Sequence, residues 1–395
     1  KKISACNLYI PCTHMSMKKT SYIICCSYVK SMCTVCTLLA VWMFSSCVPE
    51  NKGVFLKNKM SYADLLSITE EEGYYKVDVI NPWDTTRLLQ QLILTDDVDK
   101  PGLPEGTKIM IPLRKSLVMT AVHCSLLEEL GCSDAVSSVC DAEFINSPKL
   151  KVQIKSGRVV DCGNSMIPSI EKIISVRPDA MLLSPYEQNN LTKLENLRIP
   201  IILCADYMET TPLGRAEWMK FYGILYGRKE LADSLFQATE ERYQNLKSTI
   251  RKVGSRPAVL SEKRMGQAWF VPGARSTVGH LYSDAGASNP FSGMESRNGS
   301  VPLSPEQVLQ QAKGADIWLL KSDKDITLRS LGEENPIYQQ FYPYQSRNVW
   351  SCNTMDTYFY EKAPFHPDLL LADFIRIFHP ELEIPGENIF YFKTR

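Results

Sequence analysis

Strand-like and helix-like hydrophobic patterns alternate along much of this 395-residue chain. Short apolar runs such as Ala180–Leu183 and Ile317–Leu320 are separated by segments with helical spacing. The exchange recurs every ~10–15 residues, as it does where helices connect the strands of one sheet. Parallel strands need a long crossover, which is usually a helix. The chain is therefore predicted to be an α/β protein built from parallel βα units.

One stretch of about forty residues breaks this alternation. Leu213–Tyr226 and Lys229–Lys252 have helical spacing and almost no strand signal. A helix of about 24 residues would be about 36 Å long, which is close to a domain diameter. We therefore expect two Rossmann-like α/β lobes, each with a central sheet, joined by one long helix. A single helical strut resists bending, so the closure of the lobes should be small.

The pattern divides the chain into five regions. They are a signal peptide at 1–46, a lipidated cysteine and tether at 47–60, an N-terminal lobe at 61–211, linking helices at 212–253 and a C-terminal lobe at 254–395. In the first lobe we expect an antiparallel meander of three strands, at Leu65–Thr69, Tyr75–Ile80 and Leu88–Leu94. Lys108–Pro112 predicts a short buried strand, and Val118–Leu130 predicts a helix that ends at Gly131.

The amino-terminal region has the features of an export signal. Lys18, Lys19 and Lys30 precede the uncharged apolar run Cys33–Phe44, and small residues lead to Cys47. This order is typical of a lipoprotein signal, in which Cys47 is lipidated after cleavage. A transmembrane helix is the alternative, but a span needs about 20 apolar residues. Residues 1–16 lack such a pattern and are a candidate over-extended start.

Six cysteines lie in the expected globular part: Cys124, Cys132, Cys140, Cys162, Cys204 and Cys352. No Cys-x-x-Cys spacing occurs among them, so neither a zinc knuckle nor a thioredoxin-type motif is indicated. Two alternatives stay open for Cys132 and Cys140. They could pair in an oxidising compartment, or they could be small buried apolar residues.

Charge and motifs exclude several functions. The chain has 44 Lys and Arg against 44 Asp and Glu, so no basic excess indicates nucleic-acid binding. It contains no Gly-x-Ser-x-Gly, His-Glu-x-x-His, Walker A or Gly-x-Gly-x-x-Gly sequence. We therefore expect neither catalytic residues nor a metal site, and we interpret the chain as a non-enzymatic protein.

Two segments on either side of the strut are alike. Ser169-Ile-Glu171 and Ser304-Pro-Glu306 each place a glutamate in the first turn of a helix that leads to a buried strand. Such glutamates can simply complement the helix dipole, which contributes about 0.3–1 kcal/mol each. The recurrence of the same acid at the same point of both lobes favours a shared functional role.

These segments carry a family resemblance, together with His123–Gly131 (HCSLLEELG), Arg177-Pro-Asp179-Ala and Trp269–Gly273 leading to Asp284-Ala-Gly286. In this order, over residues 105–380, the chain resembles the periplasmic substrate-binding proteins of ABC importers for iron–siderophores, haem and vitamin B12, the class with a rigid helix between lobes. Glu209–Trp218 and Phe365–Asp368 resemble members from Bacteroidetes-like bacteria more loosely.

The resemblance implies a function. A monomeric lipoprotein, anchored at the periplasmic face of a Gram-negative envelope, would capture an iron chelate (siderophore or haem) and deliver it to an ABC permease and its ATPase. It implies that Glu171 and Glu306 dock on permease arginines, and that the protein has no intrinsic cofactor. A cobalamin-binding protein of the same family is one alternative. A surface lipoprotein that scavenges ligand without an importer is another.

The resemblance implies a ligand cleft between the two lobes, at loops that follow strand ends. The residues expected to line the ligand cleft are His123, Tyr186, Tyr207, Trp269, Arg275 and Tyr358, and further loop candidates are Arg114, Glu187, Tyr360 and His366. Aromatic side chains suit a large flat ligand, and arginine suits an anionic one. Each also has an ordinary structural alternative: His123 could pack or cap a helix, and the tyrosines could be surface aromatics.

Overall fold

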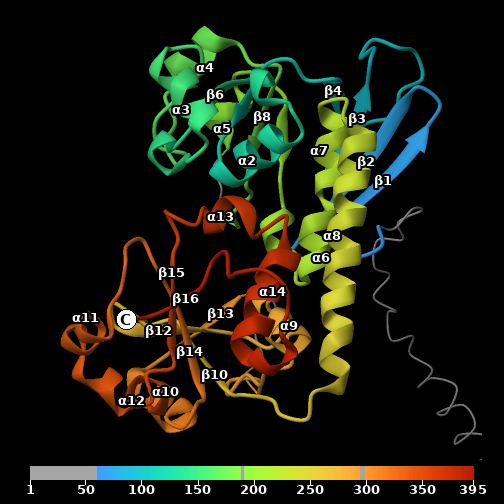
Figure 1. Cartoon of the computed structure of the whole chain (residues 1–395). Coiled ribbons are helices and arrows are strands. Elements are labelled where there is room, and N and C mark those ends of the chain that lie inside the picture. Colours follow the sequence, from blue (N-terminus) through green and yellow to red (C-terminus); the bar gives the residue numbers. More distant parts are fainter. Residues whose placement is uncertain (1–59, 188–190, 294–298) are drawn as a thin grey trace, which may run out of the picture. The chain divides into compact units, whose positions relative to one another are not determined.

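The computed structural model describes residues 60–187, 191–293 and 299–395 (Figure 1). All of these residues fall within one compact unit, Gly53–Arg395. The predicted export signal, lipidated Cys47 and most of the tether lie outside the described residues. Among the residues that are described, no helix is both long and apolar enough to cross a membrane.

The first sheet is the expected meander with one strand added. Strands β1 (Leu66–Glu71), β2 (Tyr74–Ile80) and β3 (Leu88–Thr95) are antiparallel, and β4 (Thr107–Met110) pairs parallel to β3. The meander prediction is confirmed. The buried residues of β2 and β3 are consecutive, at Val77–Ile80 and Leu92–Thr95, so both faces of the sheet are covered there. The expectation that β4 is a buried strand is wrong, since only Ile109 in it is buried.

A second sheet of five parallel strands forms the centre of the first lobe. Its order is β7-β6-β5-β8-β9, with β5 at Ser116–Val118, β6 at Val136–Val139, β7 at Val160–Asp161, β8 at Ala180–Leu183 and β9 at Ile201–Leu203. The chain builds outward from β5 to β7 on one side and then adds β8 and β9 on the other. The direction of winding therefore reverses between β5 and β8, which is where ligands bind in open α/β sheets.

Four helices connect these strands: α2 (Ala121–Glu129), α3 (Pro148–Lys155), α4 (Ile170–Val176) and α5 (Thr192–Glu195). The predicted helix Val118–Leu130 begins too early. Val118 is the last residue of β5, and α2 starts only after Thr120, whose backbone is extended. When an apolar strand is followed directly by the apolar face of a helix, the two produce one continuous hydrophobic pattern. The pattern was therefore assigned to a single helix, and β5 was not predicted.

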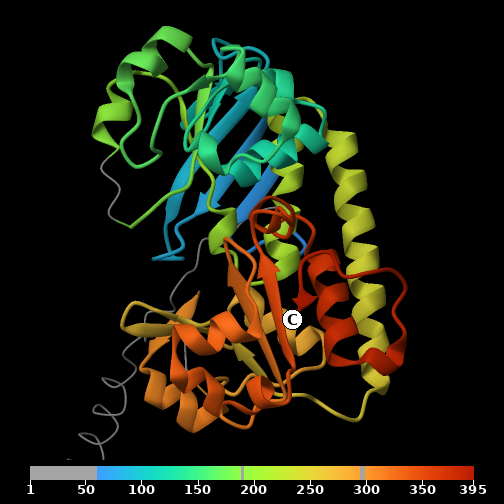
Figure 2. The same ribbon diagram turned by 60° about the vertical axis from the view of Figure 1, so that its left-hand side comes forward.

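The linking region contains three helices. Leu213–Tyr226, expected as one helix, is α6 (Pro212–Glu217) and α7 (Met219–Leu225), which meet at Trp218. Helix α8 (Lys229–Thr249) has 21 residues and buries one face through Ala232, Phe236, Thr239 and Tyr243. It packs on α7 and on α14 (Pro367–Phe378) of the second lobe, and it runs alongside both lobes in Figures 1 and 2. The predicted strut is therefore present.

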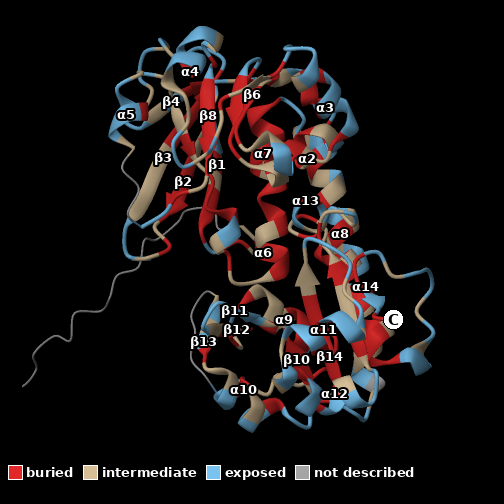
Figure 3. Ribbon diagram, turned by 90° about the vertical axis from the view of Figure 1, so that its left-hand side faces the viewer, coloured by how far each residue is buried: buried red, intermediate tan, exposed pale blue. Residues whose placement is uncertain are grey.

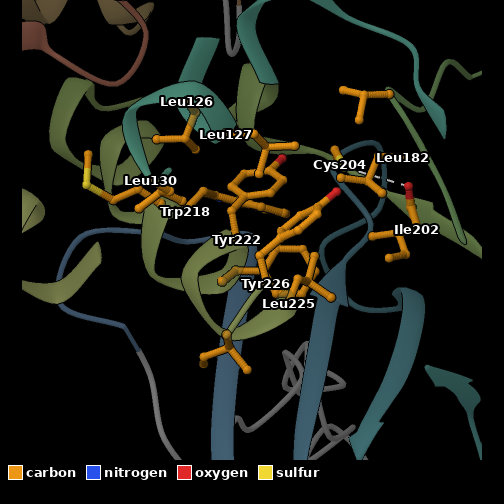
Figure 4. Close-up of a cluster of buried hydrophobic side chains, with 14 of the residues drawn as sticks. Leu126, Leu127, Leu130, Leu182, Ile202, Cys204, Trp218, Tyr222, Leu225 and Tyr226 are labelled. Carbon is orange, nitrogen blue, oxygen red and sulfur yellow. Dashed lines mark hydrogen bonds between the residues drawn. The ribbon is translucent and has the colours of Figure 1, made fainter. Parts of the chain in front are cut away.

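Aromatic residues of the linking helices complete the first lobe's core. Trp218, Tyr222 and Tyr226 are buried against leucines of α2 and against β8 and β9 (Figure 4). Burial of such large side chains is the main favourable contribution to the packing of this lobe. The strut thus grows out of the core that also supports the central sheet.

The second lobe repeats the α/β arrangement. Its main sheet has the order β10-β14-β15-β16, with β10 (Val259–Ser261), β14 (Ile317–Ser322) and β15 (Val349–Asn353) parallel and β16 (Phe392–Lys393) antiparallel. A smaller antiparallel sheet holds β11 (Arg264–Met265), β12 (Ala268–Pro272) and β13 (Ser300–Leu303). The α-helices are α9 (Thr277–Asp284), α10 (Pro305–Ala312), α11 (Leu328–Glu334), α12 (Tyr342–Gln345), α13 (Phe359–Lys362) and α14 (Pro367–Phe378). Figure 3 shows β10 and most of β14 as buried, whereas both residues of β16 are exposed.

The fold is therefore the two-lobed α/β architecture that the sequence predicts, while the exact domain boundaries stay a prediction. The six cysteines are free and buried in the described structure, so the suggested Cys132–Cys140 disulfide is not formed. Burial raises the pKa of the Cys140 thiol to about 12. These cysteines act as small apolar residues of the core.

Candidate functional site

A cavity of about 440 Å³ opens at the carboxyl edge of the five-stranded sheet. Its walls are the segments that follow β5, β7 and β8, together with α5. They comprise Met119, Thr120, Ser165, Met166, Ile167, Pro168, Ile170, Leu183, Ser184, Tyr186, Leu191, Lys193 and Leu194. This first-lobe pocket lies where the winding of the sheet reverses, which is the position that the fold offers to ligands.

The lining of the first-lobe pocket is mainly aliphatic with a few polar groups. Lys193 is the one charged residue among the lining residues, and hydroxyl groups come from Thr120, Ser165, Ser184 and Tyr186. Its volume falls within the range of about 300–1,000 Å³ that is usual for small-molecule sites. Such a lining can hold an apolar body and orient it by one anionic group.

Tyr186 and Tyr207 lie together beside the first-lobe pocket. Tyr186 lines it, and the two ring centroids are 6.5 Å apart. The Tyr207 hydroxyl donates a 2.5 Å hydrogen bond to the Pro185 carbonyl. Partial burial raises the pKa of Tyr207 to about 12, so this hydroxyl stays protonated. Tyr207 thus supports the segment that carries Tyr186.

The prediction that His123 lines the ligand site is wrong. The side chain is 1% exposed, and its Nε2 lies 2.8 Å from both Asp206 Oδ1 and the Tyr222 hydroxyl. Its Nδ1 is 2.6 Å from the hydroxyl of Thr120, the residue before α2. Burial opposes ionisation of Asp206, but the His123 imidazole and the Arg215 guanidinium lower the pKa of this carboxyl. His123 is a hydrogen-bonded core residue.

The prediction for Trp269 is also wrong, because the side chain is fully buried. Its indole stacks on Trp318 with the ring centroids 5.9 Å apart, and Tyr338 meets it edge-on at 5.5 Å. The indole Nε1 donates a 2.8 Å hydrogen bond to the Ser261 carbonyl. Trp269 therefore anchors β12 in the second lobe's core and cannot contact a ligand.

The second lobe also turns the carboxyl edge of its main sheet toward the first lobe. Helix α13 follows β15, helix α2 follows β5, and the two helices contact each other. At this edge Lys321 pairs with Glu262, and its ammonium lies 5.6 Å from the Phe359 ring. Although burial disfavours the charged form, the Glu262 carboxylate raises the pKa of Lys321.

The other predicted ligand residues lie outside the first-lobe pocket. Tyr358 precedes α13 and lines a separate cavity of about 170 Å³ between α13 and Asn146–Pro148. Arg275 is exposed just before α9. Among the looser candidates, Arg114, Glu187 and Tyr360 are exposed, and His366 Nε2 lies 2.7 Å from Glu129 Oε2. Of all these candidates, the structure places Tyr186 in the pocket lining.

The two glutamates expected to dock on a permease have the same setting. Glu171 is the second residue of α4 and Glu306 the second of α10, and both are exposed. Ser169 and Ser304 cap these helices by accepting backbone N–H groups. Bonds from their own backbone N–H groups and from the capping serines lower the pKa of both carboxyls. Both side chains therefore present fixed negative charges.

Sequence reasoning missed two buried carboxylates. Glu217 accepts hydrogen bonds from the backbone N–H groups of Ser61, Tyr62 and Ala63, and Glu209 accepts them from Asp64 and Leu65. The Trp218 indole donates to Glu209 as well. Both residues lie in Glu209–Trp218, a segment that the sequence analysis noted for its similarity to family members but to which it gave no role. These residues hold the start of the described chain against α6.

Metal-ligand geometry is absent from the described part of the chain. No group of three or more His, Cys, Asp or Glu side chains there is placed to hold a metal ion.

Known proteins match this chain in both sequence and structure. A family model described as a periplasmic binding protein matches residues 125–351, more than half of the chain. An uncharacterized lipoprotein of Methanocaldococcus jannaschii is 26% identical over 306 residues, which cover 74% of this chain and 72% of that protein. A second uncharacterized lipoprotein of that organism is 23% identical over 320 residues, covering 77% and 80%.

Solved structures share the fold at low sequence identity. A periplasmic heme binding protein from Pseudomonas aeruginosa superposes with a TM-score of 0.56 at 15% identity, covering 72% of this chain and 98% of its own. An ABC-type Fe3+-hydroxamate transport protein from Saccharomonospora viridis gives 0.52 at 17% identity, covering 68% and 94%. With its two α/β lobes, its strut and its pocket at a strand edge, this chain belongs to the periplasmic binding protein family, whose members are substrate-binding components of ABC transporters and not enzymes.

Proposed function

We propose that this protein is a lipid-anchored, extracytoplasmic binding protein that captures an iron chelate, a siderophore or haem, and delivers it to an ABC permease and its ATPase. The observation that carries the proposal is the first-lobe pocket, which lies at the switch point of a sheet in a protein of this family. The structural neighbours named for heme and for an Fe3+-hydroxamate support the choice of an iron chelate.

Capture requires a preformed site on a stable frame. The pocket walls come from short segments between buried strands, and Tyr207 fixes the segment that carries Tyr186. Recognition by such a preformed, largely apolar surface avoids the ordering of flexible loops, which would otherwise weaken binding. Small lobe closure is expected, because α8 packs on both lobes.

Delivery requires that a partner recognise both lobes at once. Each lobe carries one exposed carboxylate at the start of a capped helix, Glu171 in the first lobe and Glu306 in the second. N–H and hydroxyl donors lower the pKa of both carboxyls and so favour their ionised form. Paired charges of this kind give orientation and association rate to a complementary partner. We expect basic residues of the permease to receive them.

The docking proposal is tested by replacing both carboxylates while leaving the pocket intact. The Glu171→Gln, Glu306→Gln double variant should bind chelate as the wild type does, yet lower ligand-dependent ATPase activity in reconstituted vesicles by about tenfold or more. The matched control is Glu143→Gln with Glu387→Gln, one exposed glutamate per lobe outside any α-helical first turn. Wild-type ATPase activity in the first variant, with chelate binding intact, would show that these two glutamates are not the docking contacts.

Ligand identity is tested by titrating the purified protein with haem, ferric siderophores and cobalamin, and following tryptophan fluorescence. Saturable binding of an iron chelate is the expected result. Binding of cobalamin alone would support the alternative of a cobalamin-binding protein in the same family.

The anchor is proposed to be a lipid on Cys47. The two lipoproteins of Methanocaldococcus jannaschii support it by their names. Intact mass of the membrane-extracted protein should show the lipid adduct, and Cys47→Ser should remove both the adduct and membrane association. The Gram-negative envelope stays a prediction.

A further inference from the structure

Two large apolar side chains at the first-lobe pocket are exposed to solvent. Met166 is 64% exposed and Ile167 is 81% exposed, the highest value among large apolar side chains in the described residues. Both also line the first-lobe pocket. Contiguous exposed apolar groups at a concave surface are typical of binding sites. We call this pair the apolar finger.

The loop that carries the apolar finger is tightly hydrogen-bonded. Ser165 donates from its backbone N–H to Asp141 Oδ1 at 3.1 Å and from its hydroxyl to Asp141 Oδ2. The Met166 N–H donates to Asn164 Oδ1 at 2.9 Å. At the base, the Ser169 N–H reaches the Cys162 carbonyl at 2.9 Å. The exposure of the finger is therefore imposed by a fixed loop, because these bonds prevent the two side chains from folding back onto the core.

The opposite wall of the first-lobe pocket has a matching character. Leu183, Leu191 and Leu194 are apolar, while Lys193 is exposed and supplies a positive charge. This lining favours a ligand that covers the apolar groups and brings an anionic edge to Lys193. A chelate that is hydrophilic all round would leave the finger in water or bury its own polar groups unpaired, which opposes binding.

We propose, building on the proposed function, that Met166 and Ile167 grip an apolar face of the cargo, and that the cargo is a planar macrocyclic chelate with carboxylate groups, of the metalloporphyrin type. The recognition element is the face of the ring together with one carboxylate at Lys193. Recognition in this proposal involves no bond from the protein to the metal.

The first test compares variants of the full chain with zinc protoporphyrin as the probe. Met166→Ser with Ile167→Ser should weaken its binding by about tenfold or more. Ile174→Ser is the matched control, since this α4 residue is 51% exposed but does not line the pocket, and its affinity should stay within about twofold. Thermal midpoints by circular dichroism verify folding. A double variant that binds as the wild type does overturns the proposal.

The second test separates the ring face, the carboxylate and the metal. Metal-free protoporphyrin should bind within about threefold of the zinc form, because apolar burial does not depend on the metal. Lys193→Gln should weaken binding of the dicarboxylate ring but not of its dimethyl ester. Loss of binding on removal of the metal overturns the proposal, because it would require a protein ligand to the metal.

Failure of the inference and failure of the proposed function give different results. A wild-type protein that binds a ferric hydroxamate tightly and no porphyrin overturns the inference and leaves chelate capture standing. A wild-type protein that binds no chelate of either kind overturns both.

Discussion

At the residue scale, two buried glutamates fasten the first described residues to the linking helices. Glu209 and Glu217 are 3% and 1% exposed, and together they accept five consecutive backbone N–H groups from Ser61–Leu65. Buried carboxylates are tolerated only when such donors replace water. The segment that leads toward the proposed anchor is thereby fixed at the junction of the lobes.

We expect Glu217→Gln to destabilise the protein by about 3 kcal/mol. The substitution replaces one acceptor oxygen by an N–H₂ group, so the backbone N–H groups that bonded this oxygen would be buried without an acceptor. Denaturant unfolding of the variant and wild type measures the change. The exposed Glu387→Gln serves as the control and should stay within about 0.5 kcal/mol. An unchanged midpoint for Glu217→Gln would show that these bonds contribute little.

Glu209 predicts a specific dependence of stability on pH. Burial raises the pKa of Glu209 to about 7 from 4.5, although the N–H donors of Asp64, Leu65 and Trp218 act in the opposite direction. Between these values the folded state binds more protons than the unfolded state, so stability falls as pH rises from 4.5 to 7. The free energy of unfolding of wild type minus that of Glu209→Gln should drop by about 3 kcal/mol across this window. Parallel pH profiles of the two proteins would contradict it.

At the element scale, one glutamine joins the two sheets of the first lobe. The Gln90 side chain on β3 donates to the Ile201 carbonyl at 2.7 Å and accepts from the Leu203 N–H at 3.0 Å. Its amide thus occupies the place of a further strand beside β9, whose edge would otherwise keep unpaired groups. The N-terminal meander is coupled in this way to the sheet that carries the first-lobe pocket.

Gln90→Leu should cost about 1–3 kcal/mol, since it removes both partners from a partly buried strand edge. Gln91→Leu is the matched control, because that side chain bonds only Asp78 within the meander. Hydrogen exchange of the Leu203 amide should increase in the Gln90 variant and not in the control. Equal protection in both variants would exclude the bridging role.

At the scale of the whole folded unit, the two lobes share a second connection besides α8. Phe365, between α13 and α14, is 1% exposed within the first lobe's core, where its ring lies 5.9 Å from that of Tyr222. The Asn146 N–H donates to Glu361 Oε1 at 2.8 Å beside it. Two separate attachments leave little freedom for one lobe to turn against the other.

Phe365→Ala should destabilise the protein by about 3–5 kcal/mol, as expected for loss of a buried aromatic ring. We expect the wild type to unfold in one transition and the variant in two, one for each lobe, in differential scanning calorimetry. Phe392→Ala, at an exposed ring of β16, is the control. A single transition in the Phe365 variant would show that the lobes stay coupled without this ring.

Much of the architecture could be predicted because the evidence for it is local. The bounds of β8 agree with the apolar run expected at Ala180–Leu183, since this short run lies between clear terminators. Short elements such as β13, α12 and α13 were missed, because two to five residues hold less than one full pattern. The pairing of Ser169-Ile-Glu171 with Ser304-Pro-Glu306 was also visible in sequence, and both form capped helix starts.

The sequence by itself determined the α/β alternation, the strut and the absence of enzyme motifs, because these depend on residues that are near one another in the chain. Only the tertiary structure decided which polar and aromatic side chains are buried. His123 is a core residue because Asp206 and Tyr222 reach it from 83 and 99 residues away, and Trp269 because Trp318 and Tyr338 cover it. Local periodicity records which face of an element is apolar, but burial of a hydrogen-bonding group depends on partners that only folding brings together.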